Sequence, residues 1–217
     1  MLLWSGTALA SDGDERWEGA YGGIHVGASW LSGSMTAYTP YNSYAGFPVT
    51  GLNDSAIIGG VQLGYNIQMD SGLVFGLEAT ASLTDIDKGA YTPIDALDDA
   101  PDNRLFWRKS DFTATVAPRI GYASDSFLIT GKAGLAIADF EVGHDQNGTD
   151  IVGKKTKFGY VLGAGVEYAL TSRISAGVQY DYENFGSKSI GVSGSPDIDI
   201  DQGGDLHVAK VVLNYQF

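Results

Sequence analysis

The stretch HVAKVVLNYQF, residues 207–217, alternates between two kinds of side chain. One set of alternate positions is apolar or aromatic throughout: Ala209, Val211, Leu213, Tyr215 and Phe217. The positions between them include one ammonium group and two amides, on Lys210, Asn214 and Gln216. Because successive side chains of a strand point to opposite faces, this period of two predicts a strand with one apolar and one mixed face.

The same alternation recurs along the chain, in stretches of about the length that a tilted strand needs to cross hydrocarbon. The stretches are residues 21–30, 57–66, 73–83, 111–122, 127–140, 158–170, 173–185 and 207–217. Three of the connections are short turns rich in Asp, Ser and Gly, at residues 69–72, 124–126 and 171–173. The other four gaps are long, at residues 31–55, 84–109, 141–156 and 186–204. This order predicts an all-β, eight-stranded, antiparallel up-and-down barrel, whose even strand number lets the first and last strands pair.

A soluble barrel and a membrane barrel both alternate, but they place the apolar face on opposite sides. Eight charged residues within the predicted strands fall on the mixed face: Glu78, Asp111, Arg119, Lys132, Glu167, Asp181, Glu183 and Lys210. A Lys or Arg near the middle of a lipid face costs about 2–4 kcal/mol, which would enforce this segregation. We therefore expect the apolar face to meet lipid and the mixed face to line the lumen.

Aromatic residues near both ends of the predicted strands support a transmembrane barrel. Two such rings suit the two water–lipid interfaces, with the short turns in the periplasm and the long loops outside. The expected aromatic girdle consists of Trp30, Tyr65, Phe75, Phe112, Tyr122, Phe127, Tyr160, Tyr168, Tyr180 and Tyr182.

Composition narrows the possible functions. The chain has 217 residues and only 18% are charged, below the quarter or so that is usual for soluble proteins. The net charge of −13 argues against a nucleic-acid partner, which needs a basic surface. The chain has no cysteine, which excludes disulfides, thiol catalysis and cysteine-bound metal. No uninterrupted apolar stretch approaches the roughly 18 residues of a membrane helix.

The first residues resemble the end of a secretory signal. Ala8, Leu9 and Ala10 match the small-x-small cleavage rule, and cleavage there would leave Ser11 first. We therefore expect residues 1–10 to be a signal remnant and residues 11–217 to form the barrel domain.

Several segments resemble the small opacity-like, porin-family outer-membrane barrels of alphaproteobacteria. They are YGGIHVGASW (21–30), GGVQLGYNIQMDSGLVFGLEA (59–79), PRIGYASDSFLITGKAGLA (118–136), GYVLGAGVEYALTSRISAGVQYDYENFG (159–186) and the stretch 207–217. The resemblance covers strands and short turns, not long loops, and implies a barrel with exposed loops and no catalytic residues. A terminal strand ending in Leu213, Tyr215 and Phe217 also resembles the signal that the barrel-assembly machinery reads. Pro118 departs from this pattern, and we expect a bulge or strand end near it because proline removes a ladder bond.

The inward charges form the first candidate site: Glu78, Arg119, Lys132, Glu167, Asp181 and Lys210. Buried charges need partners, and eight strands enclose a bore that side chains can just fill, so we expect a plugged lumen. A narrow porin for small solutes is the alternative.

The other candidates are weaker. His25 is predicted to point inward, His144 to lie in a loop and His207 at the outer rim of the last strand. Because some relatives bind hemin, these histidines leave a hemin site open, and a lipid A-modifying enzyme also stays open, although no serine lies at short spacing from His207. Acidic loop residues could bind divalent cations near lipopolysaccharide: Asp95, Asp98, Asp99, Asp102, Asn103, Asp197, Asp199, Asp201 and Asp205.

The sequence thus predicts a structural outer-membrane barrel of the Gram-negative envelope, with no catalytic residues, cofactor or resident metal. The expected partners are outer-membrane lipid, lipopolysaccharide, the assembly machinery, and host or matrix ligands at the loops.

Overall fold

The computed structural model describes residues 16–32, 35–38, 47–49, 54–90, 106–146, 149–186, 188–192, 198–202 and 205–217. Side chains are described in residues 16–30, 55–85, 110–141, 156–186 and 205–217. Within the described part of the chain, no helix is long and apolar enough to cross a membrane.

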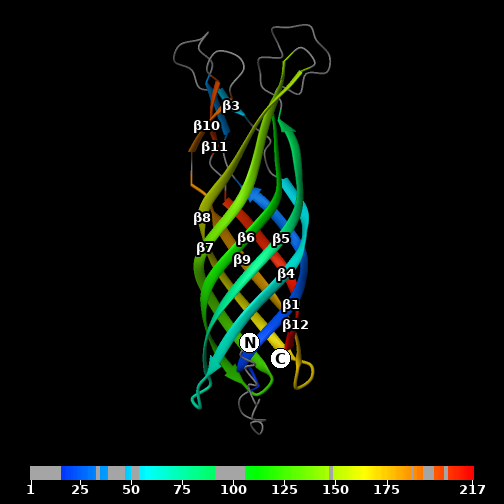
Figure 1. The fold of residues 1–217 in the computed structure, drawn as a ribbon, viewed down its shortest axis with the longest axis vertical. Coiled ribbons are helices and arrows are strands. Elements are labelled where there is room, and N and C mark those ends of the chain that lie inside the picture. Colours follow the sequence, from blue (N-terminus) through cyan, green and yellow to red (C-terminus); the bar gives the residue numbers. More distant parts are fainter. Residues whose placement is uncertain are drawn as a thin grey trace, which may run out of the picture.

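Eight antiparallel strands close into a barrel, as the alternation predicts (Figure 1). They are β1 (Gly19–Ser32), β4 (Asp54–Gln68), β5 (Leu73–Ala90), β6 (Phe106–Ser124), β7 (Phe127–Gln146), β8 (Thr149–Ala169), β9 (Ile174–Asn184) and β12 (Asp205–Gln216). The first and last of these strands pair, from Tyr21 opposite Gln216 to Ser32 opposite Asp205. The three short turns join β4 to β5, β6 to β7 and β8 to β9 at the end where β1 begins and β12 ends. This end is called the turn end below.

A second, four-stranded sheet stands beyond the opposite end of the barrel. Its strands are β2 (Met35–Tyr38), β3 (Phe47–Val49), β10 (Lys188–Val192) and β11 (Ile198–Gln202), in the order β10-β11-β2-β3. The central pair, β11 with β2, runs from Asp199 opposite Tyr38 to Gln202 opposite Met35. Figure 1 shows β3, β10 and β11 above the barrel wall. Two gaps that the sequence treats as separate loops are therefore joined by backbone pairing.

Other strands also continue into the expected loops. β7 and β8 stay paired up to Gln146 opposite Thr149, so the loop expected at residues 141–156 is mostly a hairpin. Similarly, β5 and β6 pair up to Ala90 opposite Phe106. The strands extend past the predicted stretches because ladder hydrogen bonds outside a bilayer need no apolar face. The alternation that marks the lipid-facing segments therefore stops before the strands do.

Two irregularities change which face a residue occupies. The register of β5 and β6 shifts between Leu83 and Ile86, and that of β6 and β7 shifts between Lys109 and Phe112. An extra residue reverses the alternation beyond it. Asp111, predicted to point into the lumen, is therefore exposed, whereas Ser110 is buried. The inward prediction for Asp111 is wrong for this reason.

Pro118 does not produce the expected bulge. The pairs on either side of it, Val116 with Leu135 and Arg119 with Lys132, keep the same register. Gly134 on β7 allows the two backbones to lie close here, since a Cβ on it would be 2.2 Å from the Val116 carbonyl oxygen. The missing proline N–H thus leaves a local gap in the ladder without displacing the strand.

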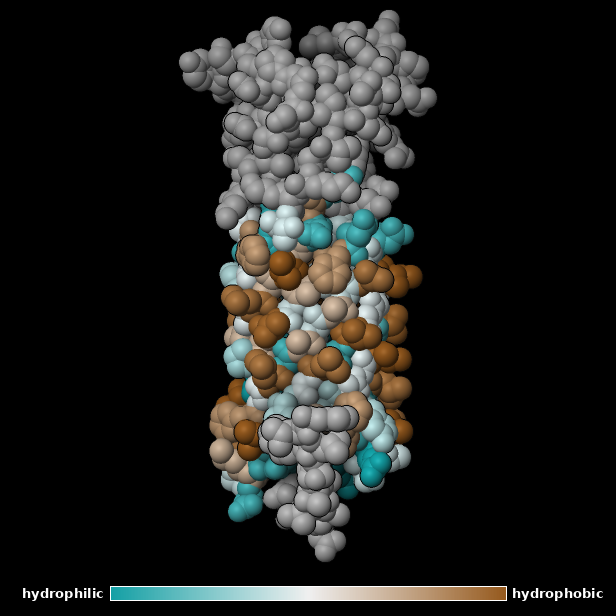
Figure 2. Space-filling view, in the orientation of Figure 1, coloured by the Kyte–Doolittle hydropathy of each residue, from teal (hydrophilic) through white to brown (hydrophobic). Residues whose placement is uncertain are grey.

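The barrel has apolar side chains outside and polar ones inside, as expected for a wall that meets lipid. Leu63 is 63% exposed on the outer face, whereas its neighbour Gln62 is 1% exposed. Leu77, Val166 and Leu213 point outward in the same way, next to inward Glu78, Glu167 and Asn214. Figure 2 shows apolar side chains over the middle of the wall, with polar residues towards both ends.

Candidate functional site in the barrel lumen

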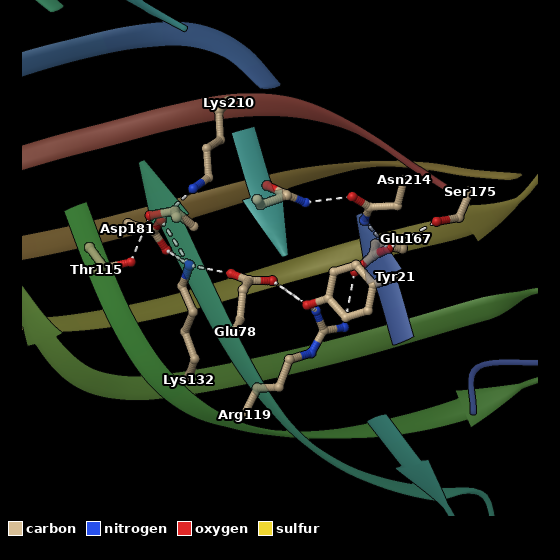
Figure 3. A network of polar contacts seen from close by, with 12 residues as sticks. Tyr21, Glu78, Thr115, Arg119, Lys132, Glu167, Ser175, Asp181, Lys210 and Asn214 are labelled. Carbon is tan, nitrogen blue, oxygen red and sulfur yellow. Dashed lines mark hydrogen bonds and ion pairs between the residues drawn. The ribbon is translucent and has the colours of Figure 1, made fainter. Parts of the chain in front are cut away.

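A buried guanidinium group links two strands across the lumen (Figure 3). Arg119 on β6 donates from Nη1 to Glu78 Oε2 at 2.9 Å and from Nη2 to Glu167 Oε1 at 3.0 Å. The Tyr21 hydroxyl donates to the same Glu78 oxygen at 2.8 Å and accepts from Arg119 Nη1 at 2.6 Å. The guanidinium also lies 5.3 Å from the centre of the Tyr21 ring. Arg119 is therefore held by two carboxylates and a phenol.

Two lysines continue the network towards β9 and β12. Lys132 Nζ lies 2.8 Å from Glu78 Oε1 and 3.0 Å from the Asp181 carboxylate. Lys210 Nζ lies 2.8 Å from Asp181 Oδ2. The structure thus brings all six predicted lumen charges together, three cations with three carboxylates, and each is nearly excluded from water. We call these six side chains the charge network. Balanced pairing of this kind is what makes buried charges tolerable.

Neutral side chains complete the hydrogen bonding of Glu167. Ser175 Oγ donates to Glu167 Oε2 at 3.0 Å, and Asn214 Nδ2 donates to the same oxygen at 2.8 Å. Gln62 Nε2 in turn donates to Asn214 Oδ1 at 2.7 Å. The sequence prediction omitted Tyr21 from this site, although its even spacing from the inward His25 is a signal that could have placed it in the lumen.

One further carboxylate lies close to the charge network without joining it. Glu183 is buried on β9 and accepts a hydrogen bond from Thr113 Oγ1 at 2.8 Å. The Thr80 and Thr115 hydroxyls are 2.8 Å apart across β5 and β6. Hydroxyl groups therefore line this part of the lumen between the charged residues.

An apolar cluster lies on each side of the charge network along the barrel axis. At the end away from the turns, buried residues pack together: Ile58, Ala117, Ala136, Ala138, Phe140, Val161, Phe185, Leu206 and Val208. The Phe140 and Phe185 rings meet edge to face at 5.4 Å, and Lys157 Nζ lies 5.1 Å from the Phe140 ring. At the turn end, Trp17 packs against Val74, Ala123, Leu128 and Ala169. We call these two groups the outer apolar layer and the turn-end apolar layer.

Trp17 reaches the turn-end layer from the segment that precedes β1. Its side chain is buried, and its backbone N–H donates to Gln68 Oε1 at 3.0 Å. Next to it, Arg16 Nη1 donates to Ser126 Oγ at 3.3 Å. Arg16 and Trp17 are thus attached to the β6–β7 turn and to the last residue of β4, and the Trp17 side chain packs into the turn-end apolar layer.

The histidines lie apart from one another. His25 is buried in the lumen, as predicted, with Nε2 2.9 Å from Ser82 Oγ. His207 lies on the outer wall near the start of β12, also as predicted. His144 belongs to β7 by backbone pairing with Ile151, not to a loop, and its side chain lies outside the described residues. Of the two histidines that a hemin site would combine, the structure describes only the side chain of His25.

Most of the acidic loop positions lie outside the described residues: Asp95, Asp98, Asp99, Asp102, Asn103 and Asp197. Asp199 and Asp201 are described only as backbone, in β11. Asp205, at the start of β12, accepts a hydrogen bond from Asn184 Nδ2. Among the described residues, no three His, Cys, Asp or Glu side chains are grouped to hold a metal ion.

The predicted girdle residues lie on the outer wall. Those at the turn end are exposed: Tyr65, Phe75, Tyr122, Phe127 and Tyr168. At the other end, Trp30, Tyr160 and Tyr180 are exposed, and Phe112 and Tyr182 are half-buried. Phe217 is exposed with its ring 5.5 Å from that of Tyr215, and its N–H donates to the Ala20 carbonyl at 3.0 Å. The assembly role of Leu213, Tyr215 and Phe217 stays a prediction, and the expected cleavage after Ala10 lies outside the described residues.

Comparison with known proteins gives the same architecture. The family described as outer membrane protein beta-barrel domain matches residues 1–217. The 31 kDa outer-membrane immunogenic protein of Brucella melitensis is 28% identical over 215 residues, which cover 93% of this chain and 84% of that protein. The 22 kDa outer membrane protein of Rhizobium leguminosarum is 35% identical over 145 residues, covering 67% of this chain and 56% of that protein. The crystal structure of OprG from Pseudomonas aeruginosa superposes with a TM-score of 0.55 at 15% identity, over 92% of this chain and 96% of that one.

Proposed function

This chain belongs to the family of outer membrane protein β-barrel domains, and on that premise we propose that it is a closed, structural barrel rather than a pore. It is an outer-membrane β-barrel protein of the Gram-negative envelope, similar to named outer-membrane proteins of Brucella and Rhizobium. A structural and surface role fits this membership. The further question is whether the lumen conducts.

The observation that carries the proposal is the filling of the lumen in three successive layers. Trp17 and its neighbours occupy the turn end, the charge network occupies the middle, and Phe140 and Phe185 occupy the other end. An ion that enters from the turn end would have to lose its water against apolar side chains before it reached the charges. An ion from the other end would meet Phe140, Phe185 and their apolar neighbours, with Glu183 and Lys157 as the charged groups among them. Leaving bulk water for such surroundings is strongly unfavourable for an ion.

A narrow porin is the second candidate, and one feature of the charge network favours it. Glu78 is shared by Arg119 and Lys132, and Asp181 is shared by Lys132 and Lys210. A shared carboxylate can exchange partners without losing all its ion pairs, so the middle layer alone could open transiently. The apolar side chains of the two other layers have no ion pairs to exchange, so they would stay packed while the middle layer rearranged. For this reason we prefer the closed barrel.

The part of the protein beyond the barrel wall suggests where contacts are made. The sheet of β10, β11, β2 and β3 and the β7–β8 hairpin extend past the outer apolar layer, on the side away from the short turns. Short turns face the periplasm in bacterial barrels. These elements would therefore face outward, where lipopolysaccharide, host or matrix molecules are the proposed partners. The name of the Brucella relative, an immunogenic protein, is consistent with surface exposure.

Planar-bilayer recording tests the closed lumen. We expect the folded chain to give no reproducible unit conductance, and the same sample should migrate differently on gels before and after heating, which reports an intact barrel. A variant with Trp17, Phe140 and Phe185 all changed to alanine is the matched comparison, because it thins both apolar layers and leaves the charge network in place. Reproducible conductance of the unmodified chain would refute the closed barrel and support the porin.

A further inference from the structure

Five ring-bearing side chains lie together on the outer wall, at the end away from the turns. Trp30, His207 and Tyr182 follow one another across β1, β12 and β9 as directly opposite residues. The Trp30 and His207 rings are stacked, with centroids 5.8 Å apart and an angle of 7° between planes. The Tyr180 hydroxyl is 2.6 Å from His207 Nδ1. Tyr160 on β8 extends the group, with its ring 6.2 Å from that of Tyr182.

We call these five side chains the aromatic platform. The Tyr182 and His207 rings are 5.3 Å apart, and the Trp30 and Tyr180 rings are 6.2 Å apart, so each ring contacts at least one other. Their mutual contacts restrict the rotation of the rings, and much of their surface still faces outward, since Trp30 is 37% exposed and Tyr180 is 42% exposed. The platform is therefore an ordered surface that is accessible from the membrane side.

A uniform interfacial girdle does not account for this grouping. Round the same end of the barrel, outward positions on β4, β5 and β7 carry Ile57, Leu83 and Leu135 instead of hydrogen-bonding rings. At the turn end, by contrast, the exposed aromatic residues are spread over β4, β5, β6, β7, β8 and β12. Rings that can both stack and hydrogen-bond are thus concentrated on four adjacent strands at one end.

The platform has a polar border on the side away from the bilayer centre. Asn184 on β9 lies opposite Asp205 on β12, two residues beyond Tyr182 and His207 respectively. Asn184 Nδ2 donates to Asp205 Oδ1 and lies 3.3 Å from the Tyr182 hydroxyl. The border therefore offers a carboxylate and a carboxamide next to phenolic hydroxyl groups. These groups suit neutral hydroxyl partners, whereas the Asp205 carboxylate would repel a phosphate.

This combination points to one kind of ligand. Aromatic faces carry the negative part of the ring quadrupole, so they attract the positively polarised C–H bonds on the flat side of a sugar ring. Carboxylate and amide groups beside them can hydrogen-bond the hydroxyls of that sugar. The strand ends away from the short turns lie at the outer leaflet. We propose that the aromatic platform binds the saccharide headgroup of an outer-leaflet glycolipid, with the sugar stacked on Trp30, Tyr180 and Tyr182 and bordered by Asn184 and Asp205.

The proposal depends on the outer-membrane location of the barrel but not on a closed lumen. A conducting barrel could carry the same outer wall, so the two proposals can fail separately.

Lipid binding by the detergent-folded full chain tests the platform. The probe is lipid A, whose headgroup is a phosphorylated disaccharide, and bound lipid is counted by native mass spectrometry. We expect Trp30→Leu and Tyr180→Leu each to weaken lipid A binding by roughly two- to twelvefold, the fold-change that corresponds to one aromatic contact of about 0.5–1.5 kcal/mol. The matched controls are Tyr65→Leu and Tyr122→Leu, which remove exposed rings at the turn end and should leave binding unchanged. Heat-dependent gel migration of each variant confirms that the barrel is folded.

Two further probes separate the sugar from other parts of the lipid. Dephosphorylated lipid A should bind about as well as lipid A, and phosphatidylglycerol should bind more weakly than either. Added chelator should not change the result. The proposal is overturned if binding requires the phosphates or a divalent cation, if the turn-end variants weaken binding as much as Trp30→Leu, or if the unmodified chain shows no preference for lipid A.

Discussion

Replacing Arg119 by methionine tests how the lumen is stabilised. The substitution keeps a long side chain but removes the cation that Glu78 and Glu167 share. Glu78 keeps Lys132 at 2.8 Å, whereas Glu167 is left with the neutral donors Ser175 and Asn214. Breaking a buried ion pair by removing one partner costs about 3–5 kcal/mol, because the remaining charge is buried without compensation. We expect Arg119→Met to lower the free energy of unfolding by that amount.

Lys132→Met is the matched comparison, because it also removes a cation that bridges two carboxylates. In this variant Glu78 keeps Arg119 and Asp181 keeps Lys210, so each carboxylate retains one cation. The expected loss is that of hydrogen bonds to charged groups, roughly 1.5–3 kcal/mol. The structure therefore predicts that Arg119→Met is the more destabilising of the two.

Equilibrium urea unfolding in phospholipid vesicles, followed by tryptophan fluorescence, measures both losses. The double variant Arg119→Met, Glu167→Gln should be more stable than Arg119→Met alone, because it also neutralises the carboxylate that lost its cation. If Lys132→Met proves as destabilising as Arg119→Met, or if the glutamine restores nothing, the assignment of Arg119 as the compensating charge for Glu167 is wrong.

Three other substitutions test the outer face and the two apolar layers. Val211→Arg puts a charge on the outer wall and should lower the free energy of unfolding in vesicles by about 2–4 kcal/mol, whereas Val211→Leu should be nearly neutral. If the two variants unfold at the same urea concentration, the wall does not face lipid. Phe140→Ala opens a cavity in the outer apolar layer and should cost about 3–5 kcal/mol by urea unfolding, clearly more than Phe158→Ala on the exposed outer face of β8. Trp17→Ala should shift the urea-unfolding midpoint down, because it removes the largest side chain of the turn-end apolar layer; an unchanged midpoint would contradict that packing.

The barrel could be predicted from the sequence because lipid enforces a strict alternation. A charge on the wrong face is costly in hydrocarbon, so Glu78, Arg119 and Glu167 fall at the positions that the pattern assigns to the lumen. The same rule misplaced Asp111, since a register shift between Lys109 and Phe112 reverses the faces and leaves no mark in the composition. Which carboxylate meets which cation depends on the stagger of the strands, and a single sequence does not reveal that stagger.

Three other features could not be predicted, each for its own reason. The alternation predicts which residues face the lumen but not how they are grouped along the barrel axis. It therefore does not predict that Phe140 and Phe185 pack together at the end away from the turns. The pairing of β2 with β11 escapes prediction because it lies beyond the lipid, where backbone hydrogen bonds hold strands together without a periodic apolar face. Trp17 lies outside the alternating stretches, so the pattern gives no prediction for its side chain. Its position at the turn end depends on a contact that the pattern does not encode, the hydrogen bond from its backbone N–H to Gln68 Oε1.

The sheet that joins β2 to β11 has a consequence for the order of assembly. β2 follows the first barrel strand and β11 precedes the last one, so the two segments come near each other only when β1 and β12 meet. Before that meeting, they are separated by most of the chain, and bringing them together would carry the full entropy loss of a long loop. We therefore expect this sheet to form together with, or after, the pairing of β1 and β12. A reagent that binds only the paired β2 and β11 would therefore report the number of closed barrels. It would not bind chains that have inserted into the membrane but whose β1 and β12 have not yet paired.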